Sequence, residues 1–255
     1  MIRRIAARDG LFMVVTVMMM AGFSAPITAQ VPEEYTNLKV LPEDISQRQL
    51  LTIMRGFTRA LGVRCSTCHV GEESQDLSEY DFASDDEATK RTAREMLEMV
   101  RSINENVISS LADRGTPEIE VSCVTCHAGR RRPTTLLQEL TWVAADGGWE
   151  AAEALYHELR ERYYGLGTLN FGRRTLEDFA TGRLRDDDLL GALAALELNL
   201  ELYPEAWNSW ALKGQVHVRS DQTEEAIAAL ERSLELLPGN PRVLQVLERL
   251  KSGGD

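Results

Sequence analysis

Two short stretches, Cys65-Ser66-Thr67-Cys68-His69 and Cys123-Val124-Thr125-Cys126-His127, decide how this chain folds. They contain all four of its cysteines. The spacing is that of c-type haem attachment: two thiols on one helical turn can reach both vinyl groups of one porphyrin, and the adjoining histidine can meet the iron. The sequence therefore predicts two haem c groups. The residues expected to hold them are Cys65, Cys68, Cys123 and Cys126 as covalent attachments, and His69 and His127 as iron ligands.

The alternatives for the same cysteines are a pair of disulfides and a four-cysteine zinc site. Neither alternative needs a histidine after each pair. The 54 residues between Cys68 and Cys123 also exceed the ~15 to 20 residues usual between the cysteine pairs of a zinc site. Haem attachment accounts for the whole of both motifs.

An export signal is expected at residues 1–29. It combines three arginines within residues 3–8, the apolar run Leu11–Ala25 and small residues ending at Ala29. The run is shorter than the ~20 residues that a spanning helix needs, which argues against an uncleaved anchor. No cysteine follows it to receive a lipid. The predicted location is periplasmic or otherwise extracytoplasmic, in an oxidising compartment.

The composition describes a folded globular protein, with 44% hydrophobic and 27% charged residues in 255. The net charge is -12, and removal of the leader, whose charge is +2, leaves -14. An acidic balance of this size argues against binding to nucleic acid. It suits instead a soluble protein that is steered toward cationic patches on protein partners.

A first amphipathic helix is expected over residues 43–61, between Pro42 and Gly62. It leads directly into the first motif, so its apolar stripe can lie over a haem plane. Met54 on this stripe is a candidate for the sixth iron ligand, because a thioether is a soft donor. Periodicity alone leaves open that Met54 only fills the core.

A second, longer helix is expected over residues 85–114, with Ser84 and Glu87 spaced as a capping box. Its stripe includes Met96 and Met99, three residues apart and therefore on the same face. Either methionine could serve the second haem or belong to the core. Periodicity does not choose between them.

The basic run Arg130–Arg132 follows the second motif directly. Guanidinium groups at this place could pair with haem propionates. The alternative is a solvated run of charge without a fixed partner.

Several runs together resemble the cytochrome subunit family of photosynthetic reaction centres: Asn37–Leu41, Leu61–Cys65, Thr92–Val100 with Ile103-Asn104, and Val121–Gly129. The resemblance covers roughly residues 37 to 135. In that family each haem is attached through such a motif, and most irons are ligated by a histidine and by a methionine from a preceding helix. The family's subunit has four haem groups in two halves, whereas this chain has one half and two motifs.

The resemblance implies Met54 as the partner of His69 and Met96 as the partner of His127, with Met99 as the alternative to Met96. It also implies electron donation to a reaction centre as a role for this chain. Two-haem relatives can also work outside photosynthesis.

The C-terminal part has the spacing of a tetratricopeptide repeat. One repeat is indicated by Trp210, Gly214, Ala226, Leu230 and Pro238. A period of 34 residues earlier stand Ala192, Leu196 and Pro204. We expect two repeats over about 173–240 and a closing helix over 241–250. Stacked helix pairs leave a concave face that commonly binds a partner protein, and the alternative is that the repeats only support the cytochrome.

The expected organisation is a signal peptide at 1–29, a dihaem cytochrome c domain at 30–140, a helical linker at 141–172 and a tetratricopeptide-repeat domain at 173–255. The linker would contain a helix over residues 149–164 and a glycine-rich break. The fold class is therefore all-α.

The predicted function is single-electron transfer between redox protein partners by an exported c-type cytochrome, without a small-molecule substrate and without enzymatic turnover. Docking on a membrane redox complex through the repeats is part of this hypothesis. The rival hypotheses are a dihaem peroxidase-like enzyme and a haem-based redox or gas sensor with a repeat scaffold. His157 and His217, the two histidines outside the motifs, are expected to be structural, since one lies on a charged helix and the other at a packing position of a repeat.

Overall fold

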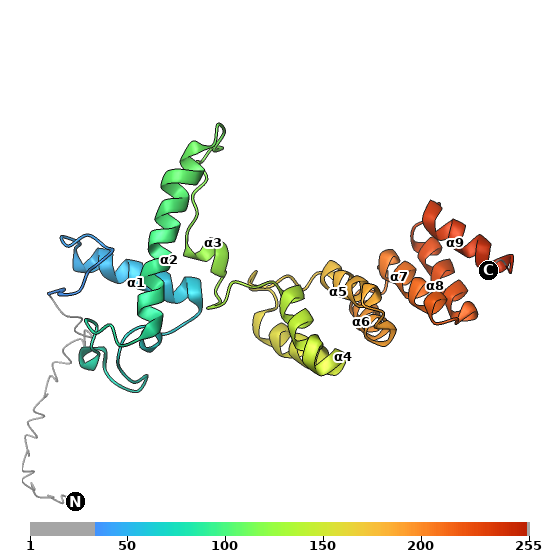
Figure 1. Ribbon diagram of the computed structural model, residues 1–255, viewed down its shortest axis with the longest axis horizontal. Coiled ribbons are helices and arrows are strands. Elements are labelled where there is room, and N and C mark those ends of the chain that lie inside the picture. The colour runs from blue at the N-terminus through green and yellow to red at the C-terminus, as the bar shows by residue number, and fades with distance from the viewer. Residues whose placement is uncertain (1–33, 254–255) are drawn as a thin grey trace, which may run out of the picture.

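The computed structural model describes residues 34–253, so the predicted signal peptide lies outside the described residues. Within this range the regular structure is helical, and Val70 and Asp81 form one isolated β-bridge. Figure 1 shows an elongated arrangement, with α1 to α3 at one end, α4 in the middle and α5 to α9 in succession toward the C-terminus. The helices are α1 Gln47–Leu61, α2 Ala88–Ser102, α3 Cys123–His127, α4 Leu136–Tyr163, α5 Arg173–Arg185, α6 Leu189–Leu202, α7 Trp207–Arg219, α8 Thr223–Leu236 and α9 Pro241–Lys251. The all-α expectation is confirmed.

Helix α1 starts later than Pro42 suggested. Its N-cap is Ser46, whose hydroxyl accepts from the Gln49 backbone N–H while the Gln49 side chain accepts from the Ser46 backbone N–H. This reciprocal capping satisfies two backbone donors, so the helix begins there. The predicted end is confirmed, since Gly62 adopts the left-handed conformation with φ 63°.

The predicted second helix, 85–114, is wrong in its length and in its cap. Helix α2 ends at Ser102 and continues as a π-turn over Ile103–Val107 and a 3-10 turn over Ile108–Ser110. The Ser84 hydroxyl accepts from the Asp86 N–H rather than capping the helix. A short local bond of this kind competes with helix formation and delays its start.

Helix α4 is longer than the helix expected over 149–164 and is bent at Gly148, which has φ 65° and ψ -163°. Its inner face belongs to the same apolar cluster as α5 and α6, where Tyr156 meets Phe171 with ring centroids 5.7 Å apart. Much of the expected linker 141–172 is therefore packed into the C-terminal core. The division of the chain into domains stays a prediction.

The helix pairs α5–α6 and α7–α8 with α9 beyond them confirm the repeat reading. Gly214 lies against Leu230, and a Cβ at this glycine would come within 2.7 Å of that side chain. A glycine at this point is what lets the two helices of the pair approach closely. Val243 and Leu247 of α9 form one apolar cluster with Leu230 of α8 and Ala211 of α7, and α9 packs mainly on α8.

The apolar core is distributed very unevenly. Before α4, the buried apolar side chains of the described part are Leu50, Ala60 and Tyr80, and all others follow residue 135. Residues 34–135 therefore bury little protein against protein, although they contain both cysteine motifs.

Candidate haem site

The first motif forms a tight turn immediately after α1. Cys65–Thr67 is a 3-10 turn, and the Cys65 carbonyl accepts from the backbone N–H groups of Cys68 at 3.1 Å and His69 at 3.0 Å. The Thr89 hydroxyl of α2 donates to the Thr67 carbonyl. Burial raises the pKa of the Cys68 thiol. Both sulfurs are thus held within one turn and neither belongs to a disulfide.

The His69 imidazole is half-buried against the ring of Phe82, whose centroid lies 4.9 Å away in an edge-on geometry. Within residues 34–253 its Nδ1 is buried without a hydrogen-bond partner. Burial, followed by the charge of Lys90, lowers the pKa of His69, and the Phe82 backbone opposes this shift. A neutral imidazole is the form that binds a metal.

The second motif is a helix of one turn, α3, preceded by Ser122. The Thr125 hydroxyl accepts from the Ser122 backbone N–H at 3.0 Å and stabilises the start of the turn. His127 Nδ1 lies 2.9 Å from the Arg130 carbonyl. Because a carbonyl only accepts, Nδ1 carries the proton and Nε2 keeps its lone pair. That tautomer leaves Nε2 available to iron.

The two motifs are brought together where the end of α1 crosses the end of α3. The Gly129 backbone N–H donates to the Ala60 carbonyl at 2.9 Å. A Cβ built on Gly62 would lie 2.1 Å from the Gly129 carbonyl oxygen, so no other side chain fits there. Gly129 is itself left-handed, with φ 86°. This backbone crossing fixes the entry to the first motif against the exit from the second.

Asn104 in the π-turn holds the segment that leads into the second motif. Its amide nitrogen donates to the Val121 carbonyl at 2.8 Å, and its amide oxygen accepts from the Val121 N–H at 2.8 Å. The widened turn places this side chain, which is consistent with the frequent occurrence of π-turns at functional sites. Asn104 thus positions Cys123 relative to α2.

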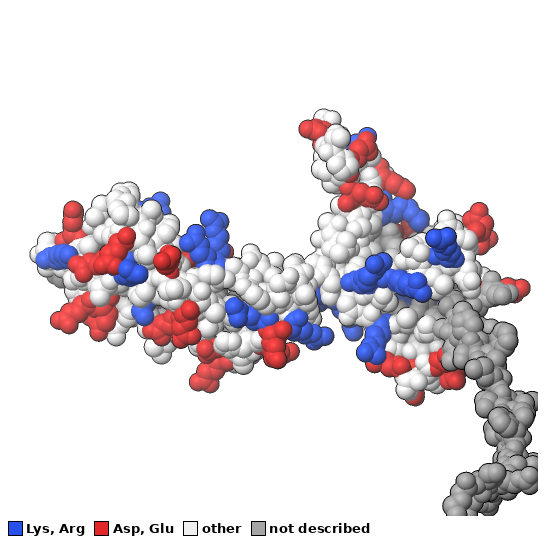
Figure 2. Space-filling view, turned by 180° about the vertical axis from the view of Figure 1, so that it is seen from behind, with Lys and Arg blue, Asp and Glu red and all other residues white. Residues whose placement is uncertain are grey.

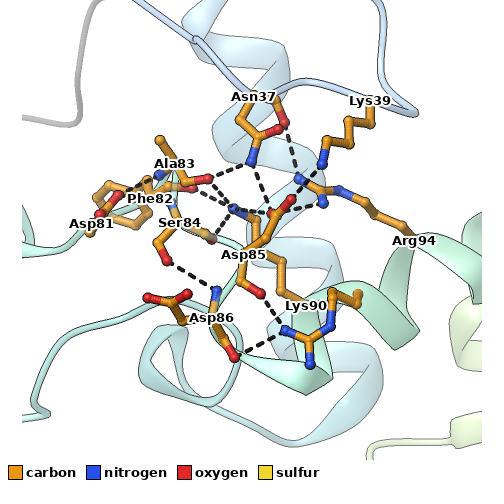
Figure 3. Close-up of polar contacts among 11 residues, drawn as sticks. Asn37, Lys39, Asp81, Phe82, Ala83, Ser84, Asp85, Asp86, Lys90 and Arg94 are labelled. Atoms are coloured by element: carbon orange, nitrogen blue, oxygen red, sulfur yellow. Dashed lines mark hydrogen bonds and ion pairs between the residues drawn. The ribbon is translucent and has the colours of Figure 1, made fainter.

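Asp85 is the centre of a polar network that ties the N-terminal segment to α2 (Figure 3). Its carboxylate accepts from Arg94 at 2.7 Å, Asn37 at 2.9 Å and Lys39 at 2.5 Å, and Lys90 lies 3.4 Å away. The hydrogen bonds from Arg94 and then Lys39 hold the pKa of Asp85 well below its usual value. We name these five residues the Asp85 network.

Lys90 extends the network to the loop that carries Phe82. Its ammonium is mostly buried and donates to the carbonyls of Phe82 at 2.8 Å, Ala83 at 3.1 Å and Ser84 at 2.6 Å. Three directed bonds fix this loop on α2 (Figure 3). Phe82 is thereby held against His69, so the network positions the first motif's imidazole without touching it.

The basic run has three different environments. Arg130 forms a half-buried ion pair with Glu139 at 2.6 Å and lies over the ring of Tyr163 at 5.4 Å. Arg132 lies over the ring of Trp142 at 5.1 Å. A carboxylate of the chain thus already pairs with Arg130, and a propionate partner for the basic run stays a prediction. Arg131 is exposed, and its charge opposes the rise in the pKa of Cys68 that burial causes.

The candidate thioether ligands differ in exposure. Met54 on α1 is half-buried, whereas Met96 and Met99 on α2 have exposed fractions of 42% and 45%. The last two are so similar that exposure does not distinguish them. His217 is buried in α7 with Nδ1 2.7 Å from Gln222 Oε1, and His157 is exposed on α4 with its ring edge-on to Tyr156.

These residues fit c-type haem better than zinc. Among the described residues, no group of three or more histidine, cysteine or carboxylate side chains converges as a metal site would. Each motif instead offers two free thiols and one imidazole. In His127 the Nε2 atom is free to bind iron, and in His69 the Nδ1 atom has no hydrogen-bond partner. Large apolar side chains of the kind a porphyrin covers are exposed between residues 96 and 124: Met96, Met99, Val107, Leu111, Ile119 and Val124.

Sequence reasoning missed the residues that position the motifs rather than form them. Asn104, Asp85 and Lys90 act through partners 5 to 48 positions away, such as Val121 and Asn37. Asn37 and Asn104 lie in the runs that carry the family resemblance, which was the available signal. A single polar residue that holds two segments together produces no periodic pattern in the sequence.

Comparison with known proteins relates the N-terminal half to one protein family. The statistical model of the photosynthetic reaction centre cytochrome C subunit family matches residues 16–162. The photosynthetic reaction center cytochrome c subunit of Roseobacter denitrificans is 32% identical over 122 residues, 47% of this chain and 31% of that protein. That of Thermochromatium tepidum is 32% identical over 117 residues, 45% of this chain and 24% of that protein. The chain thus spans about a third or less of the length of these relatives.

Among solved structures, the first TPR of Spaghetti (RPAP3) bound to HSP90 peptide SRMEEVD overlaps 46% of this chain and 89% of its own, with a TM-score of 0.34 and 19% identity. The overlap is loose, and the repeats are defined by their own helices. Within residues 34–253 we find no helix with the length and apolarity required to cross a bilayer. Since the family match extends over more than half of the residues and includes both motifs, the chain belongs to the photosynthetic reaction centre cytochrome C subunit family.

Proposed function

We propose that this protein is an exported dihaem c-type cytochrome that passes single electrons between redox protein partners. The observation that carries the proposal is the crossing of Gly62 and Gly129, which holds two complete attachment motifs side by side. When bound, haem iron supplies a one-electron change. The chain's contribution is to fix both imidazoles, one through the Arg130 carbonyl and the other through Phe82.

The proposed axial ligands are His69 with Met54 and His127 with Met96, Met99 being the alternative. The family supplies the methionine assignment. The half-burial of Met54 on the helix that enters the first motif supports it. Thioether ligation favours ferrous iron and so gives a higher reduction potential than two histidines would.

We further propose that the protein works in the periplasm or an equivalent compartment, as the leader sequence and covalent haem suggest, and that the repeats dock it on a partner. A reaction centre or another membrane redox complex fits the family's name as that partner. The acidic net charge of -12 favours a partner with a cationic docking patch for the cytochrome half.

The first test is the number of haem groups in protein matured by a cytochrome c assembly system. A pyridine haemochrome assay should give two per chain, and Cys123→Ser with Cys126→Ser should remove one while the other remains. One or none in the unaltered protein would contradict the proposal.

The second test separates a carrier from the rival enzyme and sensor functions. Both irons of a carrier are six-coordinate, so carbon monoxide should leave the reduced spectrum unchanged. Rapid binding of carbon monoxide to the reduced, unaltered protein would favour an enzyme or a sensor instead.

A further inference from the structure

The inner helices of the repeats present basic and amide side chains in a register that repeats every 34 residues. A hollow of about 230 Å³ between α5 and α7 is lined by Thr181, Leu184, Arg185, Leu212, Gln215 and Arg219. Thr181 and Gln215 are one repeat apart, as are Arg185 and Arg219. Equivalent positions of the two repeats therefore meet in one concavity.

The register continues along each helix and into α9. Positions two helical turns before Thr181 and Gln215 lie on the same face and are Arg174 and Asn208. One repeat farther on, the two rows continue on α9, whose Val243 and Leu247 share an apolar cluster with Ala211 of α7. The first row is Arg174, Asn208 and Arg242, the second is Thr181, Gln215 and Arg249, and the third is Arg185 and Arg219. None of these rows contains a carboxylate.

These five arginines are exposed, and the exposed carboxylates close to them in the sequence include Asp178, Asp186 and Glu248. Among residues 34–253, Arg174, Arg185, Arg242 and Arg249 form no ion pair, whereas Arg219 is anchored to Asp187. The carboxylate of Glu177 in α5 is turned into the core, where it accepts from the Ser209 hydroxyl at 2.9 Å. Four guanidinium groups of this face thus remain free to bind an external acid.

The charge of the outer helices is opposite. Helix α6 contains no lysine or arginine, and α8 contains four glutamates and one arginine. Figure 2 shows carboxylates spread over both halves of the molecule, interleaved with lysine and arginine. The inner helices α5, α7 and α9 together contain nine lysine and arginine residues and three carboxylates. This excess of basic charge is unusual in a chain whose net charge is -12. Guanidinium groups bind carboxylates through two parallel hydrogen bonds, which makes this face selective for them.

We propose that the concave face of α5, α7 and α9 binds an extended acidic segment of a partner protein. Packed helices lie roughly 8 to 10 Å apart, and an extended chain advances about 3.3 Å per residue. Carboxylates spaced every third residue match the spacing of the rows. The inference rests on the part of the proposed function that assigns partner docking to the repeats, and it is independent of the number of haem groups.

The test is selection of peptides from a random dodecapeptide phage library on the full, haem-loaded protein, followed by fluorescence anisotropy with the selected peptides. The selected sequences should be enriched in Asp and Glu, with spacings of three. Arg174→Glu and Arg242→Glu should each weaken binding about tenfold or more, because reversing a charge in a bound ion pair replaces attraction with repulsion. Both positions lie in the first turn of a helix, where a carboxylate is favourable, so folding is preserved.

The matched control is Arg232→Glu on the outer helix α8, which makes the same change in net charge and should alter binding less than about twofold. Equal losses of peptide affinity in the control and in the two variants of the concave face would overturn the proposal. Selected peptides without enrichment in Asp and Glu would overturn it as well. Salt-sensitive dimerisation in sedimentation experiments, abolished by Arg242→Glu, would assign the face to a second copy and overturn it also. Unchanged haem absorbance in all three variants separates these outcomes from failure of the cytochrome function.

Discussion

The backbone crossing between the two motifs predicts a large effect from a single methyl group. In Gly62→Ala the new Cβ would lie 2.1 Å from the Gly129 carbonyl oxygen, so the two chains must separate. Separation breaks the Gly129 N–H to Ala60 bond of 2.9 Å, which contributes about 1 kcal/mol. Alanine at a φ of 63° costs about 1 to 2 kcal/mol more. We expect the cytochrome half to lose about 3 kcal/mol of unfolding free energy.

Two control substitutions separate the contributions. Gly239→Ala also has a positive φ of 80° but nothing within 4 Å of the new Cβ, so it carries the conformational cost alone. Gly56→Ala lies inside α1 with nothing within 4 Å and should stabilise by up to about 1 kcal/mol. From the most to the least stable, the order should therefore be Gly56→Ala, wild type and Gly62→Ala.

The assay is urea unfolding of haem-loaded protein, followed at the Soret band for the cytochrome half and by ellipticity at 222 nm for the helices. The midpoint should fall in Gly62→Ala with an unchanged slope. A Soret midpoint for Gly62→Ala within error of wild type would refute the reasoning, because it would mean that the crossing is not a fixed contact.

Three further perturbations test the rest of the site. Asn104→Ala removes two hydrogen bonds and should cost about 2 kcal/mol in the same titration, with lower occupancy of the second attachment site by haemochrome assay. Met54→Ala should open one iron to carbon monoxide, and comparison of Met96→Leu with Met99→Leu by the same spectra should show which methionine serves the second haem. The pKa of Asp85 is depressed in the folded state, so its carboxylate stabilises the fold above its ordinary pKa, and this stabilisation is lost as pH falls below that value. The stability difference between wild type and Asp85→Asn should accordingly be largest near neutral pH and shrink toward pH ~3 in urea titrations.

The repeats were predictable because their information is local and repeated. A period of 34 residues places small residues such as Gly214 and Ala226 where helices touch, and the structure has its helix pairs there. The glycine break before α5 was predictable for the same reason, since Gly165 and Gly167 have φ of 79° and 73°. Such conformations are readily adopted only by glycine.

The segment between the second motif and the repeats was harder to predict, because the residues that determine its structure lie far apart in the sequence. Helix α4 combines a bent middle at Gly148 with apolar positions on both sides, so its periodicity breaks and only Trp149 onward looks helical. Arg130 illustrates the same difficulty, since nothing in the basic run indicates that Glu139, in the first turn of the next helix, forms an ion pair with it. Pairing of this kind depends on where α4 starts, which is set by the Thr135 cap.

The apolar stripe of α2 shows most clearly where periodicity stops being informative. A stripe predicts that a helix face is covered, but not by what, and Met96, Met99 and Val107 remain exposed in the described structure although they keep helical spacing. The same hydrophobic pattern serves a face that meets another helix and a face that meets a flat cofactor. In this chain the attachment motifs resolve the ambiguity: a segment with two of them, few buried side chains and an exposed thioether stripe has the composition of a cofactor-binding half. The repeats, which bury their own stripes, need no such group.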